Sequence, residues 1–81
     1  PFNPVTTLRF DLPEDAMVTI TIYDMLGRVV RTLVNSQQTA GYKVLQWNTT
    51  NDNGTPVSGG IYLYTIYAGD FKKARKMVLL K

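Results

Sequence analysis

The residue types that perform most chemistry in small proteins are missing from this 81-residue chain, which contains no His and no Cys. The chain therefore lacks a Ser-His or Cys-His nucleophile pair, an imidazole proton shuttle, a zinc finger and a redox thiol. Six carboxylates remain for acid–base chemistry of the glycosidase type. Asp11 lies on an exposed strand face, and the other five fall in expected turns: Glu14, Asp15, Asp24, Asp52 and Asp70. We predict no enzymatic activity and no cofactor, because a domain this small offers little cleft.

A Thr- and Asn-rich segment has part of the spacing of an EF-hand calcium loop, in which oxygen ligands at positions 1, 3 and 5 precede a Gly. Aligning Gly54 with that Gly places Thr49, Asn51 and Asn53 at the ligand positions. Gly60 then stands where the bidentate Glu is needed. A hard dication requires carboxylate oxygen, and none occurs at these positions. We therefore predict an Asx-type turn rather than a metal site.

Aromatic side chains on a flat surface can stack on sugar rings, and this chain has several such residues near one another in sequence. Strand alternation assigns Trp47, Tyr62 and Tyr64 to the core, which leaves Tyr67 and Tyr23 as the exposed rings. Two scattered tyrosines are weak support for a binding platform. A carbohydrate-binding module remains open as a third possibility for function.

Basic residues are concentrated at one end of the chain. Five of the nine Lys and Arg residues lie among the last ten positions: Lys72, Lys73, Arg75, Lys76 and Lys81. No carboxylate lies there, whereas the first 71 residues hold four basic and six acidic side chains. Only Phe71 could stack on a base in this stretch, so nucleic-acid binding is not expected. Two interpretations remain: a cationic recognition strand, or a solvated sheet edge whose Lys residues prevent edge-to-edge pairing.

The elements that position these residues are short strands, because apolar and polar residues alternate in several segments. The segments are 5–12, 16–24, 29–34, 42–47, 61–68 and 71–81. Val30 and Leu33 cannot share a face without a bulge. Residues 35–41 are expected to form a polar loop, and 48–60 is the longest turn-rich stretch. We predict one all-β domain over residues 1–81, an antiparallel immunoglobulin-like β-sandwich of about seven strands.

Several positions are expected to hold this sandwich together. Trp47 is large enough to organise the core, and Gly27 is suited to a tight turn with positive φ. Gly69 and Asp70 predict a two-residue hairpin before the final strand. The full set of structural positions is Gly27, Trp47, Gly54, Gly60, Tyr62 and Tyr64.

The longest uninterrupted apolar runs have four residues, whereas a membrane-spanning helix needs about 18 or more. We therefore expect no transmembrane segment. The chain begins at Pro1 without an initiator Met, which indicates a processing boundary and suggests a piece of a longer protein.

Five motifs follow one another along the chain. They are Pro-Phe-Asn-Pro-Val-Thr-Thr-Leu-Arg-Phe at 1–10, Val-Thr-Ile leading to Tyr-Asp-Met-Leu-Gly-Arg within 18–28, Gly-Tyr followed by Trp within 41–47, Asp-Asn-Gly followed by Ser-Gly-Gly-Ile-Tyr within 52–62, and Lys-Met-Val-Leu-Leu-Lys at 76–81. In this order they resemble the C-terminal sorting domain of proteins exported by the bacterial type IX (Por) secretion system. The chain is also similar to a related family, the immunoglobulin-like domain of flagellar hook-capping proteins. One departure is Asn-Thr-Thr at 48–50, where the family often has Asp or Gly after the Trp.

The resemblance implies a non-catalytic delivery role. It predicts an N-terminal cargo domain, transit through the periplasm, and display on the surface of a Gram-negative bacterium or release into the medium. The implied partners are the outer-membrane secretion machinery and a sortase-like peptidase, and no nucleic acid is expected. In that family the signal lies in the last part of the domain, which corresponds here to residues 71–81. Its most specific residues are Lys76, Met77, Val78, Leu79, Leu80 and Lys81.

Physical chemistry offers a mechanism for such a signal. A cationic terminal strand can attract a receptor by charge and offer it a sheet edge for strand addition. The alternative is a structural immunoglobulin-like spacer or assembly module of a cell-surface enzyme, without a sorting role.

Overall fold

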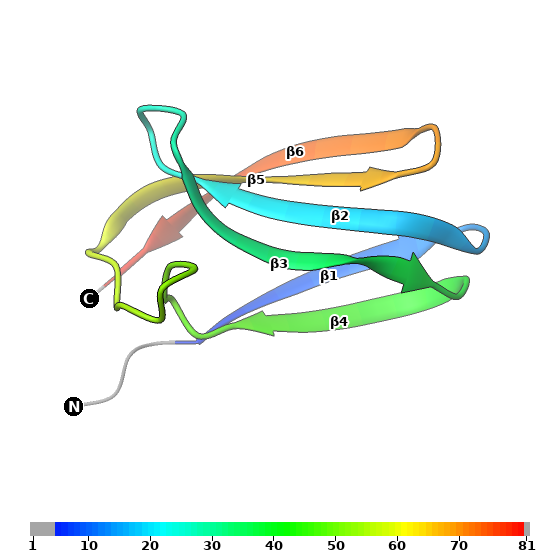
Figure 1. Cartoon of the computed structure of the whole chain (residues 1–81), viewed down its shortest axis with the longest axis horizontal. Coiled ribbons are helices and arrows are strands. Elements are labelled where there is room, and N and C mark those ends of the chain that lie inside the picture. The colour runs from blue at the N-terminus through cyan, green and yellow to red at the C-terminus, as the bar shows by residue number, and fades with distance from the viewer. Residues whose placement is uncertain (1–4, 81) are drawn as a thin grey trace.

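The structure, a computed structural model, describes residues 5–80 and contains six strands in two antiparallel sheets. The strands are β1 (Thr6–Leu12), β2 (Ala16–Tyr23), β3 (Val29–Gln38), β4 (Gly41–Trp47), β5 (Gly60–Ala68) and β6 (Phe71–Leu79). β1 pairs with β4, and the other four form a sheet in the order β3-β2-β5-β6 (Figure 1). The predicted all-β, immunoglobulin-like sandwich is confirmed, with six strands in the described residues. No helix among them is long and apolar enough to cross a membrane.

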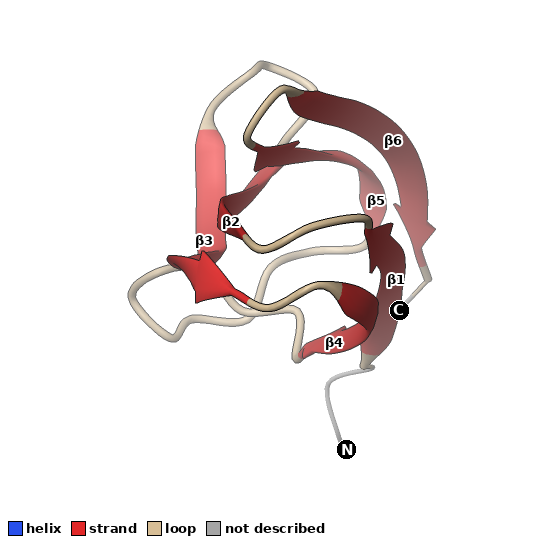
Figure 2. Ribbon diagram, turned by 90° about the vertical axis from the view of Figure 1, so that its right-hand side faces the viewer, coloured by secondary structure: helices blue, strands red, loops and turns tan. Residues whose placement is uncertain are grey.

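Both sheets contribute apolar side chains to one core. Val18, Ile20 and Ile22 of β2 are completely buried, as their alternation predicts. Viewed roughly along the strands, the two sheets wrap around this shared interior (Figure 2). The buried apolar residues are Leu8, Phe10, Leu12, Val18, Ile20, Ile22, Trp47, Tyr62, Tyr64, Ile66, Ala68 and Leu79.

Trp47, the last residue of β4, is the largest fully buried side chain. Its ring meets Tyr62 edge-on, with the centroids 5.8 Å apart and an interplanar angle of 72°. The indole Nε1–H donates to the carbonyl of Thr50 at 2.8 Å, and the Tyr62 hydroxyl donates to the carbonyl of Ser58 at 2.5 Å. The aromatic centre of the core therefore holds the 48–59 loop near both of its ends.

β3 is longer than the sequence predicted. Residues 35–38, expected in a loop, instead continue the strand and pair with residues 16–19 of β2. An edge strand needs only its backbone for pairing, so its exposed side chains can be polar. The connection to β4 shrinks to Thr39 and Ala40, and the Asp15 carboxylate accepts a hydrogen bond from the Ala40 N–H at 2.7 Å.

The predicted irregularity of β3 is confirmed. Ile20 and Thr21 of β2 are neighbours, but their partners are Val34 and Thr32, so the register passes over Leu33. A second shift passes over Val30. Both skipped side chains pack against the core, because each bulge turns an extra residue toward the same face.

The turn from β2 into β3 is stabilised by Asp24. Its carboxylate accepts hydrogen bonds from the backbone N–H groups of Leu26 and Arg28, at 2.9 and 3.0 Å, and pairs with the Arg28 guanidinium at 2.8 Å. The Arg28 N–H is the main cause of a lowered pKa for Asp24; the Arg28 guanidinium and the Leu26 N–H add to it, and partial burial opposes it. Gly27 completes the turn with a φ of 83°, a conformation that favours glycine.

Candidate functional site

β6, which the sequence predicted as a possible recognition strand, forms one edge of the four-stranded sheet. β6 pairs with β5 along its whole length, from Phe71 opposite Ala68 to Leu79 opposite Gly60. No other strand of the described residues pairs with it. The predicted two-residue hairpin at Gly69 and Asp70 connects the two strands. Within residues 5–80, one side of the β6 backbone is therefore left without a paired strand.

The four cations of β6 lie on both faces of the sheet and are all exposed. Lys72 and Lys76 share the outer face with residues of β5 such as Tyr67. Lys73 and Arg75 are on the opposite, core-side face, where their β5 partners are buried. Both nevertheless remain exposed at this edge of the sheet. A partner at this edge would meet positive charge above and below its backbone.

The last predicted signal residues divide into structural and accessible positions. Leu79 is buried in the core and Met77 is half-buried against it. Val78 and Leu80 are exposed, and Lys81 lies outside the described residues. Met77 and Leu79 thus hold the end of β6 in the sandwich, while Val78 and Leu80 are available to a partner.

The free backbone groups of β6 follow from the hairpin geometry. A two-residue turn makes the flanking pair, Ala68 and Phe71, a hydrogen-bonded pair. Hydrogen-bonded and non-hydrogen-bonded pairs alternate along an antiparallel ladder. Every second residue after Phe71 therefore directs its N–H and C=O away from β5. These residues are Lys72, Ala74, Lys76 and Val78.

No carboxylate among residues 5–80 forms an ion pair with the cations of β6. The two ion pairs in that range use Arg28 and Arg31, both outside the strand. Lys72 does have a ring neighbour, since its Nζ lies 5.9 Å from the centroid of Tyr67. Within the part of the chain that the structure describes, no carboxylate thus balances the positive charge of this edge.

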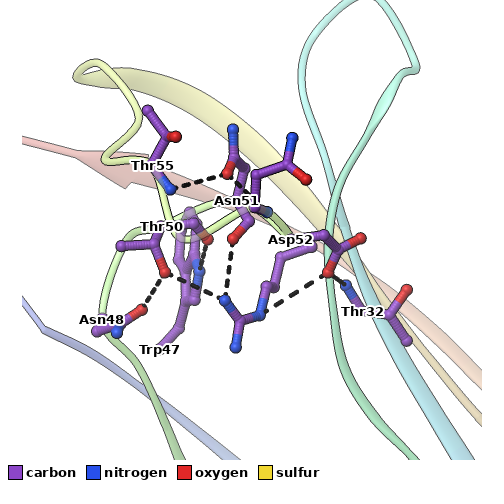
Figure 3. A network of polar contacts seen from close by, with 9 residues as sticks. Thr32, Trp47, Asn48, Thr50, Asn51, Asp52 and Thr55 are labelled. Atoms are coloured by element: carbon purple, nitrogen blue, oxygen red, sulfur yellow. Dashed lines mark hydrogen bonds and ion pairs between the residues drawn. The ribbon is translucent and has the colours of Figure 1, made fainter.

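The opposite edge of the same sheet, β3, is covered by the 48–59 loop. The backbone N–H of Asp52 donates to the carbonyl of Val30 at 3.0 Å. The Asp52 carboxylate accepts a hydrogen bond from the backbone N–H of Thr32, also at 3.0 Å (Figure 3). These two bonds satisfy edge groups that another strand would otherwise use. The first half of β3 is therefore closed to pairing.

Arg31 secures this loop, and no motif of the sequence indicated its role. Its Nη1 donates to the Thr50 hydroxyl at 3.2 Å and to the Asn51 carbonyl at 2.9 Å. Its Nε lies 3.9 Å from the Asp52 carboxylate, and 32% of its side chain is exposed. Because its partners lie 19 and more positions further along the chain, no local spacing could reveal them.

The predicted Asx turn is present in this loop. The Asn51 side-chain oxygen accepts hydrogen bonds from the backbone N–H groups of Asn53 and Thr55, at 2.9 and 3.0 Å (Figure 3). The Asn51 oxygen, one of the three candidate ligand positions, is thus engaged within the turn. No group of three or more His, Cys, Asp or Glu residues gathers within residues 5–80. Gly54 completes the turn with a φ of 82°.

The remaining candidate positions are parts of the fold or single rings on the sheet surface. Tyr62 and Tyr64 are buried, as the strand alternation predicts, and Gly60 begins β5. Tyr67 is 44% exposed and Tyr23 is half-buried, both on the outer sheet face. Tyr23 lies four residues along β2 from the residue opposite Tyr67, a separation of about 13 Å. The two rings do not form a common platform, and no pocket is found in the described part of the chain.

The two sheets, the shared aromatic core and the absence of helices in the described residues define an immunoglobulin-like β-sandwich. Residues 3–70 match the sequence model of the FlgD Ig-like domain, and the chain belongs to this family. The predicted relationship to the immunoglobulin-like domain of hook-capping proteins is thereby confirmed. The family match ends at residue 70, immediately before β6.

Two solved structures share the fold. FlgD from P. aeruginosa superimposes with a TM-score of 0.74 at 22% identity, over 94% of this chain and 60% of that chain. Dimeric latent PorU from Porphyromonas gingivalis superimposes with a TM-score of 0.69 at 23% identity, over 96% of this chain and 8% of that chain. The present chain thus spans only part of each protein. No curated protein sequence matches it.

Proposed function

We propose that this immunoglobulin-like domain is a sorting module that directs an attached cargo protein through the type IX secretion machinery. The observation that carries the proposal is β6, an edge strand whose four exposed cations have no carboxylate partner within residues 5–80. The motif at 76–81 that resembles the family signal begins on this strand. On this view the domain is recognised rather than catalytic.

The anchoring of β6 supports this role. Met77 and Leu79 pack into or against the core, while the alternate residues Lys76 and Val78 stay exposed. The strand is therefore held in the sheet while its charged side chains, on both faces, stay exposed to solvent. A receptor that reads this surface needs no unfolding of the sandwich.

The proposed partners are the outer-membrane secretion machinery and a sortase-like peptidase that separates the domain from its cargo. The cargo would precede residues 1–81 in the parent protein. After transit through the periplasm, it would reach the cell surface or the medium of a Gram-negative bacterium.

The test is export of a reporter fused to this chain in a bacterium that has type IX machinery. Lys72→Gln, Lys73→Gln and Lys76→Gln together remove three charges from β6. We expect the reporter to remain in the periplasm. These substitutions are preferable to deletion of 76–81, because deletion would also remove Leu79 from the core.

The matched control removes three charges elsewhere, through Arg9→Gln, Arg28→Gln and Lys43→Gln. It changes the net charge equally but leaves β6 intact, so we expect export to continue. Equal melting temperatures for both triple variants would show that neither result reflects unfolding. Export of the β6 variant at the level of the control would contradict the proposal.

A structural spacer or assembly module is the second candidate. It is favoured by the family match, which ends at residue 70 and so does not depend on β6. On this view the unmodified chain would not export the reporter at all. The same fusion experiment therefore separates the two functions.

A further inference from the structure

We infer that the free edge of β6 binds an extended acidic segment of a partner protein by strand addition. The inference deepens the proposed function, since it rests on β6 being the strand that a receptor reads. It assigns the recognition to backbone hydrogen bonds together with carboxylates on both faces of the added strand.

The backbone supplies the first part of the site. Lys72, Ala74, Lys76 and Val78 direct their N–H and C=O groups away from β5. They span most of β6, and no described strand covers them. An extended peptide can use such a row of groups in the same way as an additional strand. Ala74, at the centre of the row, has a small side chain that leaves its backbone accessible.

The cations of β6 indicate which kind of segment could bind beside this strand. Lys72 and Lys76 are on the outer face, and Lys73 and Arg75 are on the core-side face. Side chains directly opposite one another on adjacent strands lie about 4.5–5.5 Å apart, so carboxylates of an added strand would reach these cations. Such a strand therefore needs acidic residues on both of its faces.

The same charges disfavour a second copy of this chain as the occupant. If two copies of β6 paired antiparallel along their full length, Arg75 would face Arg75 of the other copy. Lys72, Lys73 and Lys76 of each copy would add six more positive charges to the same ribbon. Like charges facing each other destabilise a strand pair. Lys residues on an edge strand commonly prevent self-association. In this strand the same positive charges would favour binding of an acidic segment.

The direct test uses a synthetic nine-residue peptide and the 81-residue chain. The peptide carries carboxylates at the four positions that oppose Lys72, Lys73, Arg75 and Lys76 in an antiparallel pairing, with valine elsewhere. A matched control peptide has the same side chains but N-methyl groups on the amides that would face β6. It keeps the charge and loses the ability to add as a strand.

Amide hydrogen exchange gives a readout specific to strand addition. With saturating acidic peptide, we expect the amides of Lys72, Ala74 and Lys76 to exchange at least about tenfold more slowly, as one added hydrogen bond at each amide predicts. The N-methylated peptide should give no such protection. Absence of protection with the acidic peptide, or equal binding of the two peptides, would overturn the inference.

A backbone variant connects the inference to export. Ala74→Pro removes one outward N–H without touching a donor of the β5–β6 ladder, and edge strands accept Pro at such positions. Ala74→Val is the matched control that retains the N–H. We expect about tenfold weaker peptide binding and reduced export for the Pro variant alone.

The two proposals can fail separately. If the triple Lys→Gln variant loses export while Ala74→Pro folds, exports normally and binds the peptide as the Val variant does, the sorting function stands and strand addition is wrong. If the Lys→Gln variant exports normally, the sorting function is wrong, and the exchange experiment alone decides whether β6 accepts a strand. If Ala74→Pro does not fold, the comparison of the two peptides still decides the inference.

Discussion

β3 and β6 are the two edges of one four-stranded sheet, and they end that sheet in different ways. At β3, Asp52 bonds the backbone of Val30 and Thr32, and Arg31 holds the covering loop in place. At β6, no described segment covers the backbone, and the side chains around it are cationic and exposed.

This difference separates structural polar residues from those available to a partner. An uncovered sheet edge favours unwanted pairing, and proteins cover it or place charges on it. This domain uses both solutions: a loop covers the first half of β3, and charges line β6. The charges engaged at β3 stabilise the fold, whereas the charges at β6 have no carboxylate partner within residues 5–80 and are suited to recognition.

The largest expected effect on stability comes from removing the side chain of Trp47, which holds the loop that covers β3. Trp47→Ala empties the centre of the core and removes the donor to the Thr50 carbonyl. We expect a loss of about 3–5 kcal/mol in the free energy of unfolding, enough to unfold a domain of this size. Urea denaturation followed by circular dichroism measures it. Trp47→Phe should lose less, and an unchanged midpoint for Trp47→Ala would contradict this account of the core.

Arg31 tests the attachment of the loop itself. Arg31→Met keeps most of the apolar stem but leaves the Thr50 hydroxyl and the Asn51 carbonyl without this donor. We expect a loss of about 1–2 kcal/mol and faster amide exchange at Thr32. Arg28→Met, at the exposed ion pair with Asp24, is the control and should change stability much less. Equal effects of the two substitutions would argue against the loop contacts.

Asp24 gives a smaller, pH-dependent effect in the turn that leads into β3. Its pKa is lower in the folded chain than in the unfolded chain, so its contribution to stability is present above the unfolded pKa. The contribution disappears as the pH falls through the lower pKa of the folded chain. Denaturation at pH 6 and pH 2.5 should show a difference between the native chain and Asp24→Asn that shrinks at the lower pH. A difference that is the same at both values would contradict the assigned contacts.

The smallest effect on stability is expected at β6. Lys72→Gln, Lys73→Gln and Lys76→Gln together should change the free energy of unfolding by less than about 0.5 kcal/mol, because none of the three side chains forms an ion pair within residues 5–80. A calorimetric melting experiment compares this variant with Arg31→Met. A loss as large as that of Arg31→Met would mean that the cations of β6 have structural partners.

Much of the fold could be predicted from short-range patterns. The alternation of Val18, Ile20 and Ile22 identified a half-buried strand, because successive side chains of a strand point to opposite faces of the sheet. The same rule indicated a bulge, because Val30 and Leu33 can share a face only if the alternation is interrupted between them. Residues 35–38 escaped prediction because an exposed edge strand carries no apolar alternation.

The site was less accessible to sequence reasoning. The cations of β6 are visible as a cluster, but their position at an edge depends on the order of the strands, which pairs β5 with both β2 and β6. The role of Arg31 depends on contacts to residues 50–52, which only the folded chain brings near β3. Long-range contacts of this kind leave no periodic signal in the sequence.

The contrast between the two edges is tested most directly by amide hydrogen exchange in the unmodified 81-residue chain, without any partner. The Thr32 amide donates to Asp52, whereas the Ala74 amide is directed toward the open edge. We expect Ala74 to exchange at least about tenfold faster than Thr32, after correction for their intrinsic rates. Equal protection of the two amides, or slower exchange at Ala74, would contradict the account of one closed edge and one open edge.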